Sequence, residues 1–136
     1  LEPGERRLVR IAATGARPAS DRVFRLRIRP VVGEVVSQDD ALKVLVGYDA
    51  LVLLRAETVR GAIDVLRDGQ RLTLVNRSNS AQELFGGQQC RAAGEDCRDL
   101  PATRLYPGQS WSVDLPHAAP GTFKQAIGSA VTTLEF

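Results

Sequence analysis

The sequence contains few of the side chains that usually carry metal or catalytic chemistry: one histidine, His117, and two cysteines, Cys90 and Cys97. A structural zinc site takes four ligands, so this set is too small, and no CxxC redox motif occurs. The sequence also lacks GxxxxGK[ST] and GxSxG motifs, and a single histidine among scattered serines and aspartates does not make a catalytic triad. We therefore expect a protein that is not an enzyme and that holds no metal or cofactor.

The remaining candidates for a polar site are typical of loops. Asp39-Asp40 and Glu95-Asp96 are adjacent acids, a pattern that favours solvated turns over a carboxylate pair or a calcium site. Gly86-Gly87 is expected in a loop rather than between a strand and a helix, which argues against phosphate binding. His117 follows a proline and is likewise expected in a loop.

Charge is nearly balanced, with 18 Lys and Arg against 16 Asp and Glu and a formal net charge of +2. This balance argues against nucleic acid as the main partner. Arg25, Arg27 and Arg29 recur at every second residue, which predicts that they line one solvated face of a strand. No apolar run approaches the roughly 20 residues of a membrane-spanning helix, so we expect no membrane span. The sequence begins at Leu1 without a visible signal peptide, which indicates a processed or truncated start.

Cys90 and Cys97 bracket the residues RAAGED, a loop that a disulfide could close. The spacing favours a disulfide, and with it an oxidising compartment, over the alternative of two free thiols in a cytosolic protein. A loop this short contributes only about 2–3 kcal/mol through chain entropy. We therefore expect the bond to fix a hairpin tip rather than to hold the fold together.

Short segments of alternating apolar residues, separated by turn residues, predict an all-β protein with an immunoglobulin-like β-sandwich. Turns are indicated by Asp68-Gly69, by the polar run 76–79 and by Pro107-Gly108, and a loop by the region 116–121. The expected strands are Leu8–Ala12, Val23–Arg29, Leu42–Leu54, Ala62–Arg67, Arg71–Asn76, Ala81–Phe85, Thr103–Tyr106, Ser110–Leu115 and Val131–Phe136.

The segment Ala41–Arg55, ALKVLVGYDALVLLR, is the most unusual of these. Leu42, Val44 and Val46 alternate with residues of the other face, and the segment then becomes almost continuously apolar before it stops at Arg55. It is roughly double to triple the length of a typical strand. A strand this long extends beyond its own sheet and leaves backbone N–H and C=O groups unpaired. The pattern therefore indicates an edge that another chain can join.

The order of several motifs resembles the periplasmic pilus chaperones, the immunoglobulin-like chaperones of chaperone–usher fimbriae. A Pro3-Gly4 turn leads into Leu8–Ile11, Asp21-Arg22 opens a strand, and the long strand closes with an arginine. Downstream, LTLVNRSN (72–79) and RLYPGQSW (104–111) are similar to strands of the family's second domain. The Tyr48–Leu51 run and the cysteine spacing resemble the alternate or archaic branches of this chaperone family.

The resemblance implies a periplasmic chaperone that binds pilin subunits by donor-strand complementation and delivers them to an outer-membrane usher. It assigns Leu42, Val44 and Val46 as the side chains that fill the groove of a subunit. The alternative is that these three residues pack in the core of their own domain. Arg55 matches the arginine of an interdomain salt-bridge network, whose acidic partners the sequence does not identify. Leu51 occupies the family's carboxylate-anchoring lysine position, so that anchor is not transferred.

A domain boundary is expected near 55–60, where the apolar run gives way to a short polar linker. Residues 1–57 then form the last part of an N-terminal immunoglobulin-like domain, and residues 58–136 a C-terminal sandwich. Because three strands cannot close a two-sheet core, we expect further chain or a second copy to cover this sheet, with self-association through the long strand. A rival hypothesis is an immunoglobulin-like structural or adhesive pilus subunit, and a second is a secreted β-sandwich enzyme or inhibitor.

Overall fold

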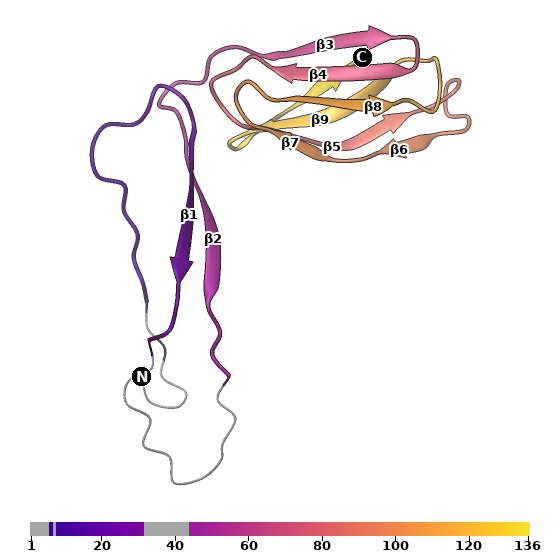
Figure 1. Ribbon diagram of the computed structural model, residues 1–136. Coiled ribbons are helices and arrows are strands. Elements are labelled where there is room, and N and C mark those ends of the chain that lie inside the picture. The colour runs from indigo at the N-terminus through magenta and orange to yellow at the C-terminus, as the bar shows by residue number, and fades with distance from the viewer. Residues whose placement is uncertain (1–5, 7, 32–43) are drawn as a thin grey trace.

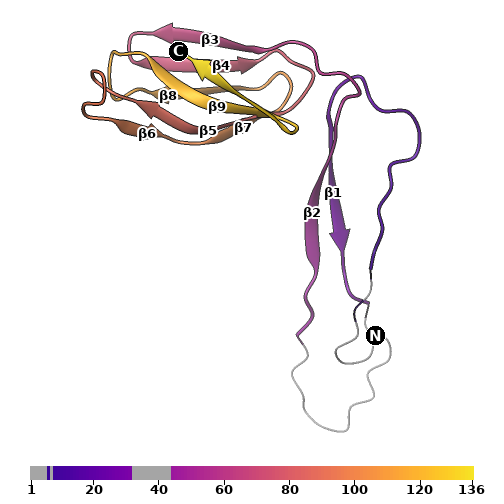
Figure 2. The same ribbon diagram turned by 180° about the vertical axis from the view of Figure 1, so that it is seen from behind.

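The computed structural model describes residues 6, 8–31 and 44–136, and this part of the chain is built from β-strands without helices. Strands β1 (Arg22–Ile28) and β2 (Tyr48–Leu54) form an antiparallel hairpin. The remaining strands form a β-sandwich, and the hairpin projects away from one end of it (Figures 1 and 2). The described part of the chain holds no helix that is long and apolar enough to cross a membrane.

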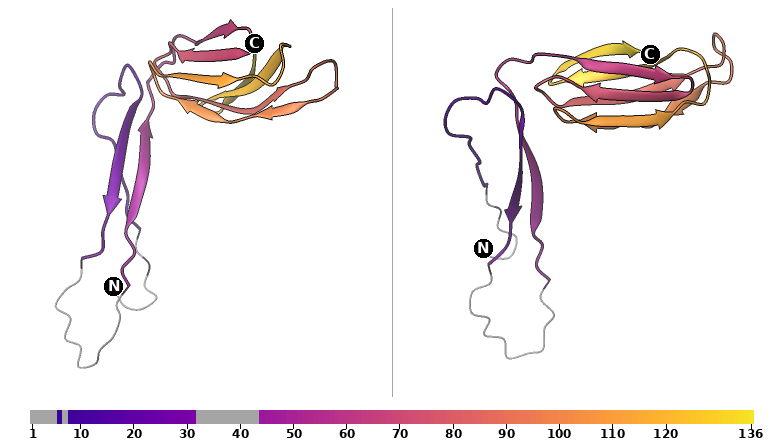
Figure 3. Two further views of the ribbon diagram at one scale, coloured as in Figure 1. Left: turned by 45° about the vertical axis from the view of Figure 1, so that its right-hand side comes forward. Right: turned by 45° about the horizontal axis from the view of Figure 1, so that its top comes forward.

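The sandwich has the layered arrangement of an immunoglobulin-like fold, as Figure 3 shows. One sheet has the order β3-β4-β8, and the other runs β10-β9-β5, with β6 and β7 both paired to the remaining edge of β5. Two residues separate β6 from β7, so the two short strands act as one interrupted strand. The bounds are β3 Ile63–Asp68, β4 Arg71–Asn76, β5 Gln82–Gln89, β6 Arg98–Leu100, β7 Thr103–Leu105, β8 Ser110–Asp114, β9 Gly121–Ile127 and β10 Ala130–Glu135.

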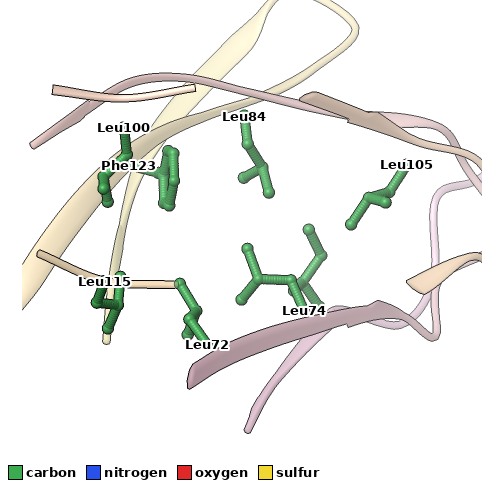
Figure 4. Packing of buried hydrophobic residues seen from close by; sticks show 8 residues of the cluster. Leu72, Leu74, Leu84, Leu100, Leu105, Leu115 and Phe123 are labelled. Atoms are coloured by element: carbon green, nitrogen blue, oxygen red, sulfur yellow. The ribbon is translucent and has the colours of Figure 1, made fainter. Parts of the chain in front are cut away.

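The core lies between the two sheets, where inward-facing side chains of alternating residues meet (Figure 4). Leu72 and Leu74 of β4 are fully buried, and Leu84 of β5 and Phe123 of β9 face them from the opposite sheet. Trp111 contacts Phe123 edge to face, with ring centroids 6.2 Å apart. Each large side chain buried in this way contributes about 1.5–3 kcal/mol, so the sandwich has a core of its own.

The turn residues explain most of the strand ends. Asp68-Gly69 closes the β3–β4 hairpin with Gly69 at φ 57°, and Pro107-Gly108 precedes β8 with Gly108 at φ 79°. Glycine adopts these positive φ values without the steric cost that a Cβ atom imposes. The predicted boundaries of β4 agree with the structure, and those of β3, β7, β8 and β10 agree within one or two residues.

The Gly86-Gly87 pair lies inside β5, so the prediction of a loop is wrong. The register of β5 against β9 shifts between Phe85 and Gln88, which marks a β-bulge at the two glycines. A Cβ atom on Gly87 would lie only 2.2 Å from the Phe123 ring. Glycine is therefore required here by close packing against the core, not by a loop.

The first part of the chain contains less strand than predicted. Residues 8–12 are exposed and form no strand, and β2 begins at Tyr48, although the sequence predicts a strand from Leu42 to Leu54. Leu42, where the strand was predicted to begin, lies outside the described residues. A strand needs a hydrogen-bonded neighbour, and β1 pairs only with residues 48–54. Apolar alternation alone therefore overestimated the paired length of these two segments.

Candidate binding surface

The β1–β2 hairpin has two chemically different faces, because its side chains alternate along both strands. The apolar face, as we call it, carries Phe24, Leu26 and Ile28 from β1 opposite Val52, Ala50 and Tyr48 from β2, with Arg22 opposite Leu54 at its end. Phe24 is 44% exposed and Ile28 37% exposed. Such a row of large exposed apolar side chains is unusual on a protein that has no partner there.

The other side, which we call the arginine face, carries Val23, Arg25 and Arg27 opposite Leu53, Leu51 and Asp49. Asp49 forms ion pairs with both arginines, at 3.5 Å from Arg25 and 3.4 Å from Arg27. Arg25 and Arg27 therefore share one face of β1, as predicted, whereas Arg29 lies beyond the last residue of the strand, Ile28.

Among the residues that the structure describes, the sheet of the hairpin contains only β1 and β2, so each strand has one edge without a described partner. Each strand pairs on one side, and no other described segment forms backbone hydrogen bonds to the outer side of either. An outer edge of this kind presents a row of free N–H and C=O groups to an approaching strand. The hairpin can therefore bind an extended segment through backbone hydrogen bonds.

Two of the three predicted subunit-binding residues are described, and both are exposed. Val44 is 77% exposed and Val46 65% exposed, and they lie in the residues that lead into β2. Neither packs into a core in this structure. They extend the apolar sequence of β2 beyond the distal end of the hairpin, where Tyr48 pairs with Ile28.

An apolar groove of 530 Å³ lies where the N-terminal segment 11–18 passes the apolar face. Its walls include Ile11 and Pro18 on one side and Phe24, Leu26 and Val52 on the other. This volume falls within the roughly 300–1,000 Å³ that is usual for ligand pockets. The groove leaves part of the apolar face open.

Arg55 lies at the junction between the hairpin and the sandwich and contacts both. Its Nη1 atom donates to the Ala81 carbonyl at 2.8 Å and to Ser80 Oγ at 3.1 Å, and it lies 3.4 Å from Asp21 Oδ2. Asp21 precedes β1 directly, and its side chain is fully buried. The carboxylate also accepts hydrogen bonds from the amides of Ala56 at 2.7 Å and Ala81 at 2.8 Å, and from Ser80 Oγ at 3.0 Å.

Asn79 forms a second set of contacts across the same junction. Its Nδ2 atom donates to the carbonyls of Ala19 at 2.7 Å and Thr58 at 2.9 Å, and its Oδ1 atom accepts from the Arg60 amide at 2.7 Å. Its own carbonyl accepts from the Asp21 amide at 2.8 Å. Together, the Asp21 and Asn79 contacts fix the base of the hairpin to the loop between β4 and β5.

Sequence reasoning did not assign Asp21 as a site residue, although Asp21-Arg22 was part of the resemblance. Asp21 directly precedes the first of the two strands and Arg55 directly follows the second, so antiparallel pairing brings the acid and the base together at one end of the hairpin. An acid before one predicted strand and a base after the next could therefore have indicated the Asp21–Arg55 ion pair from the sequence. The Ser80 and Ala81 contacts come from a different part of the chain, and no local pattern indicates them.

The predicted disulfide is present: Cys90 and Cys97 are bonded, with sulfurs 2.01 Å apart. The bond closes the loop between β5 and β6, and the chain has no other cysteine. His117 does lie in a loop, but it is only 8% exposed, and its Nε2 atom is 2.7 Å from the Asp96 carbonyl of the disulfide loop. The loop therefore packs on the sandwich through His117.

No group of three or more His, Cys, Asp or Glu side chains suited to a metal ion occurs within residues 8–31 and 44–136. The described polar clusters that stand out, at Asp21 and at Asp96, are occupied by hydrogen bonds and ion pairs of the protein itself. The arrangement that is open to a partner is therefore the hairpin, with its free edges and its two exposed faces.

Comparison of the chain with protein-family models, with curated proteins and with solved structures found no match.

Proposed function

We propose that the protein is a periplasmic chaperone of pilus assembly, which binds pilin subunits by donor-strand complementation. The observation that carries the proposal is the combination of an unpaired β2 edge with the exposed Val44 and Val46 that lead into it. An extended edge supplies backbone hydrogen bonds, and alternate apolar side chains supply specificity and burial. This is the chemistry that a sandwich lacking one strand requires.

Binding would bury side chains that are exposed in the free protein. Each valine moved from water into an apolar groove contributes about 1.5–3 kcal/mol, so Val44 and Val46 together with Leu42 provide a substantial part of the binding energy. Residues 44–47 pair with no strand in the described part of the chain, and we propose that they pair when a subunit is bound. Tyr48–Leu54, already extended in β2, would continue the same edge.

The junction at Arg55 supports this function, because the donor strand must be held in a fixed position relative to the rest of the chaperone. Asp21 and Arg55 bind each other at the base of the hairpin, and both bind residues 80–81 of the sandwich. The sandwich thereby serves as the support for the hairpin. On this proposal, residues 1–57 belong to the N-terminal immunoglobulin-like domain and residues 58–136 to the C-terminal one.

The sandwich favours the chaperone over the rival hypothesis of a pilus subunit. A subunit that accepts a donor strand lacks one strand of its own sandwich. Here the sheets β3-β4-β8 and β10-β9-β5-β6/β7 fill the seven strand positions of an immunoglobulin-like fold, with β10 in the last of them. The disulfide is in keeping with an oxidising compartment, and so with the periplasm and with delivery to an outer-membrane usher.

The proposal is tested by producing the full-length protein in a bacterial periplasm together with each pilin subunit found in the genome of the same organism. We expect the pilin to be recovered as a soluble complex with the protein, without ATP, and to be degraded or aggregated when the protein is absent. A pilin that is equally soluble alone, and that does not co-purify, would rule out a chaperone role.

A further inference from the structure

The apolar face of the hairpin does not end where β2 begins, because the residues before the strand continue it. Val46 and Val44 precede Tyr48 by two and four residues, so in an extended chain their side chains lie on the same side as those of Tyr48, Ala50 and Val52. Exposure rises along this row: Val52 is half-buried, whereas Tyr48 is 66% exposed, Val46 65% and Val44 77%. The open part of the face is therefore its distal end.

The N-terminal segment divides the apolar face into two parts. Its residues 11–18 form the groove described above with the half of the face nearer the sandwich, where Phe24 and Val52 belong to the groove wall. Tyr48 and Ile28, which pair with each other at the distal end of the hairpin, are not among the residues that line this groove. Within the described part of the chain, the distal half of the face therefore stays open to a partner.

Tyr48 contributes little to the free protein, since most of its side chain is in water. The residue opposite it on β1, Ile28, is itself 37% exposed. A Cβ atom on Gly47 would lie 3.3 Å from the Ile28 carbonyl oxygen, so the residues that lead into β2 begin directly beside the end of β1. An exposed aromatic ring next to exposed aliphatic side chains is typical of a binding surface.

The side chains of Val44, Val46 and Tyr48, which we call the distal strip, follow the edge that the client is proposed to join. They recur at every second residue over about 13 Å of extended chain, at roughly 3.3 Å per residue. The outer edge of β2, which has no described partner, begins at Tyr48. A client segment that pairs with this edge and covers the two valines therefore also reaches Tyr48.

We propose that Tyr48 is a further client-binding residue, whose ring occupies the end of the client groove after Leu42, Val44 and Val46. This inference rests on the proposed function and adds to it the shape of the groove, which must accept an aromatic ring at this end. A tyrosine suits an end position, because its ring is apolar while its hydroxyl can stay in water. The clients are thereby restricted to subunits whose groove is wide at that point.

Competition between two forms of the protein in one cell tests the proposal. The unaltered full-length protein and a full-length variant carry different affinity tags and are produced with a pilin that the unaltered protein captures, and the pilin recovered on each tag is compared. Tyr48→Ala should recover about tenfold less pilin than the unaltered protein, because buried aromatic side chains are among those that contribute most to binding. Tyr48→Phe keeps the ring and should recover nearly as much as the unaltered protein.

Leu51→Ala is the matched control. Leu51 lies on the same strand and is 43% exposed, but it belongs to the arginine face, opposite Arg25. Its removal should leave the recovery of pilin unchanged. The unfolding temperature of each free variant should match that of the unaltered protein, since both side chains are exposed, so a loss of capture reports binding and not folding.

Equal recovery with Tyr48→Ala and with the unaltered protein would overturn the proposal, as would an equal loss with Leu51→Ala. A free protein that is a dimer, and that Tyr48→Ala converts into a monomer with unchanged capture, would also overturn it, since the distal strip would then bind a second copy. If Val44→Glu abolishes capture and Tyr48→Ala does not, the assignment of Tyr48 alone fails. If the unaltered protein captures no pilin, the chaperone proposal fails, and the assignment of Tyr48 fails with it.

Discussion

Replacing Val44 by glutamate is expected to abolish recovery of the pilin with the full-length protein. The side chain is 77% exposed in the free protein, so the substitution removes no core contact and should leave the protein folded. In the proposed complex the same side chain enters an apolar groove, where an unpaired carboxylate costs several kcal/mol. The measurement is co-purification of the pilin from the periplasm, with the unfolding temperature of the free variant as the test of folding.

Val131→Glu is the matched control for that experiment. Val131 is 57% exposed on β10 of the sandwich, away from the hairpin, so the same substitution there should leave capture unchanged. Leu45, between the two valines and 52% exposed, provides a second control, because its side chain points to the opposite side of an extended segment. If the Val44→Glu protein and the unaltered protein recovered equal amounts of pilin, the assignment of the donor strand would be wrong.

The second large effect is expected for Asp21→Ala at the junction. The buried carboxylate accepts hydrogen bonds from the amides of Ala56 and Ala81, from Ser80 Oγ and from Arg55, and the substitution leaves these donors without their acceptor. A buried donor that is left without its acceptor costs about 1–3 kcal/mol, and the amides of Ala56 and Ala81 both lose theirs. We expect the loss to act on the hairpin, since the core of the sandwich does not involve Asp21.

Limited proteolysis measures that loss. Cleavage within residues 44–60 should become much faster in the Asp21→Ala protein, while the fragment that begins near residue 58 should stay resistant. Asp64→Ala is the control, because Asp64 forms an exposed ion pair with Arg77 at 3.2 Å, and pairs of this kind contribute about 0–1 kcal/mol. Equal protease sensitivity of the two variants would show that the Asp21 contacts do not hold the hairpin.

The parts of the fold that the sequence predicts correctly depend on local signals. Alternation over β4 and the Asp68-Gly69 turn specify a strand and its end within a few residues of chain, and both agree with the structure. The strand β9 was missed because Pro120 and Gly121 at its start are typical of loops. The Gly86-Gly87 pair by itself predicts a loop, because the ring that requires glycine at position 87, that of Phe123, lies far along the chain.

In the candidate site, too, some features follow from local sequence patterns and others depend on residues far apart in the chain. The common face of Arg25 and Arg27 follows from the period-two pattern that the sequence displays. The length of β2 could not be predicted, because the end of a strand depends on where its partner ends, and β1 stops at Ile28. The contacts of Arg55 with residues 80–81 join segments 25 and 26 residues apart, which no local pattern encodes.

The claim that the hairpin edge receives the client is tested most directly by amide hydrogen exchange of the full-length protein, alone and in complex with its pilin. The account predicts that exchange in residues 44–54 slows strongly on binding, because the free N–H groups of the β2 edge acquire partners, while exchange in β3, β4 and β8 stays unchanged. A complex that protects the sandwich and leaves residues 44–54 exchanging as in the free protein would contradict it.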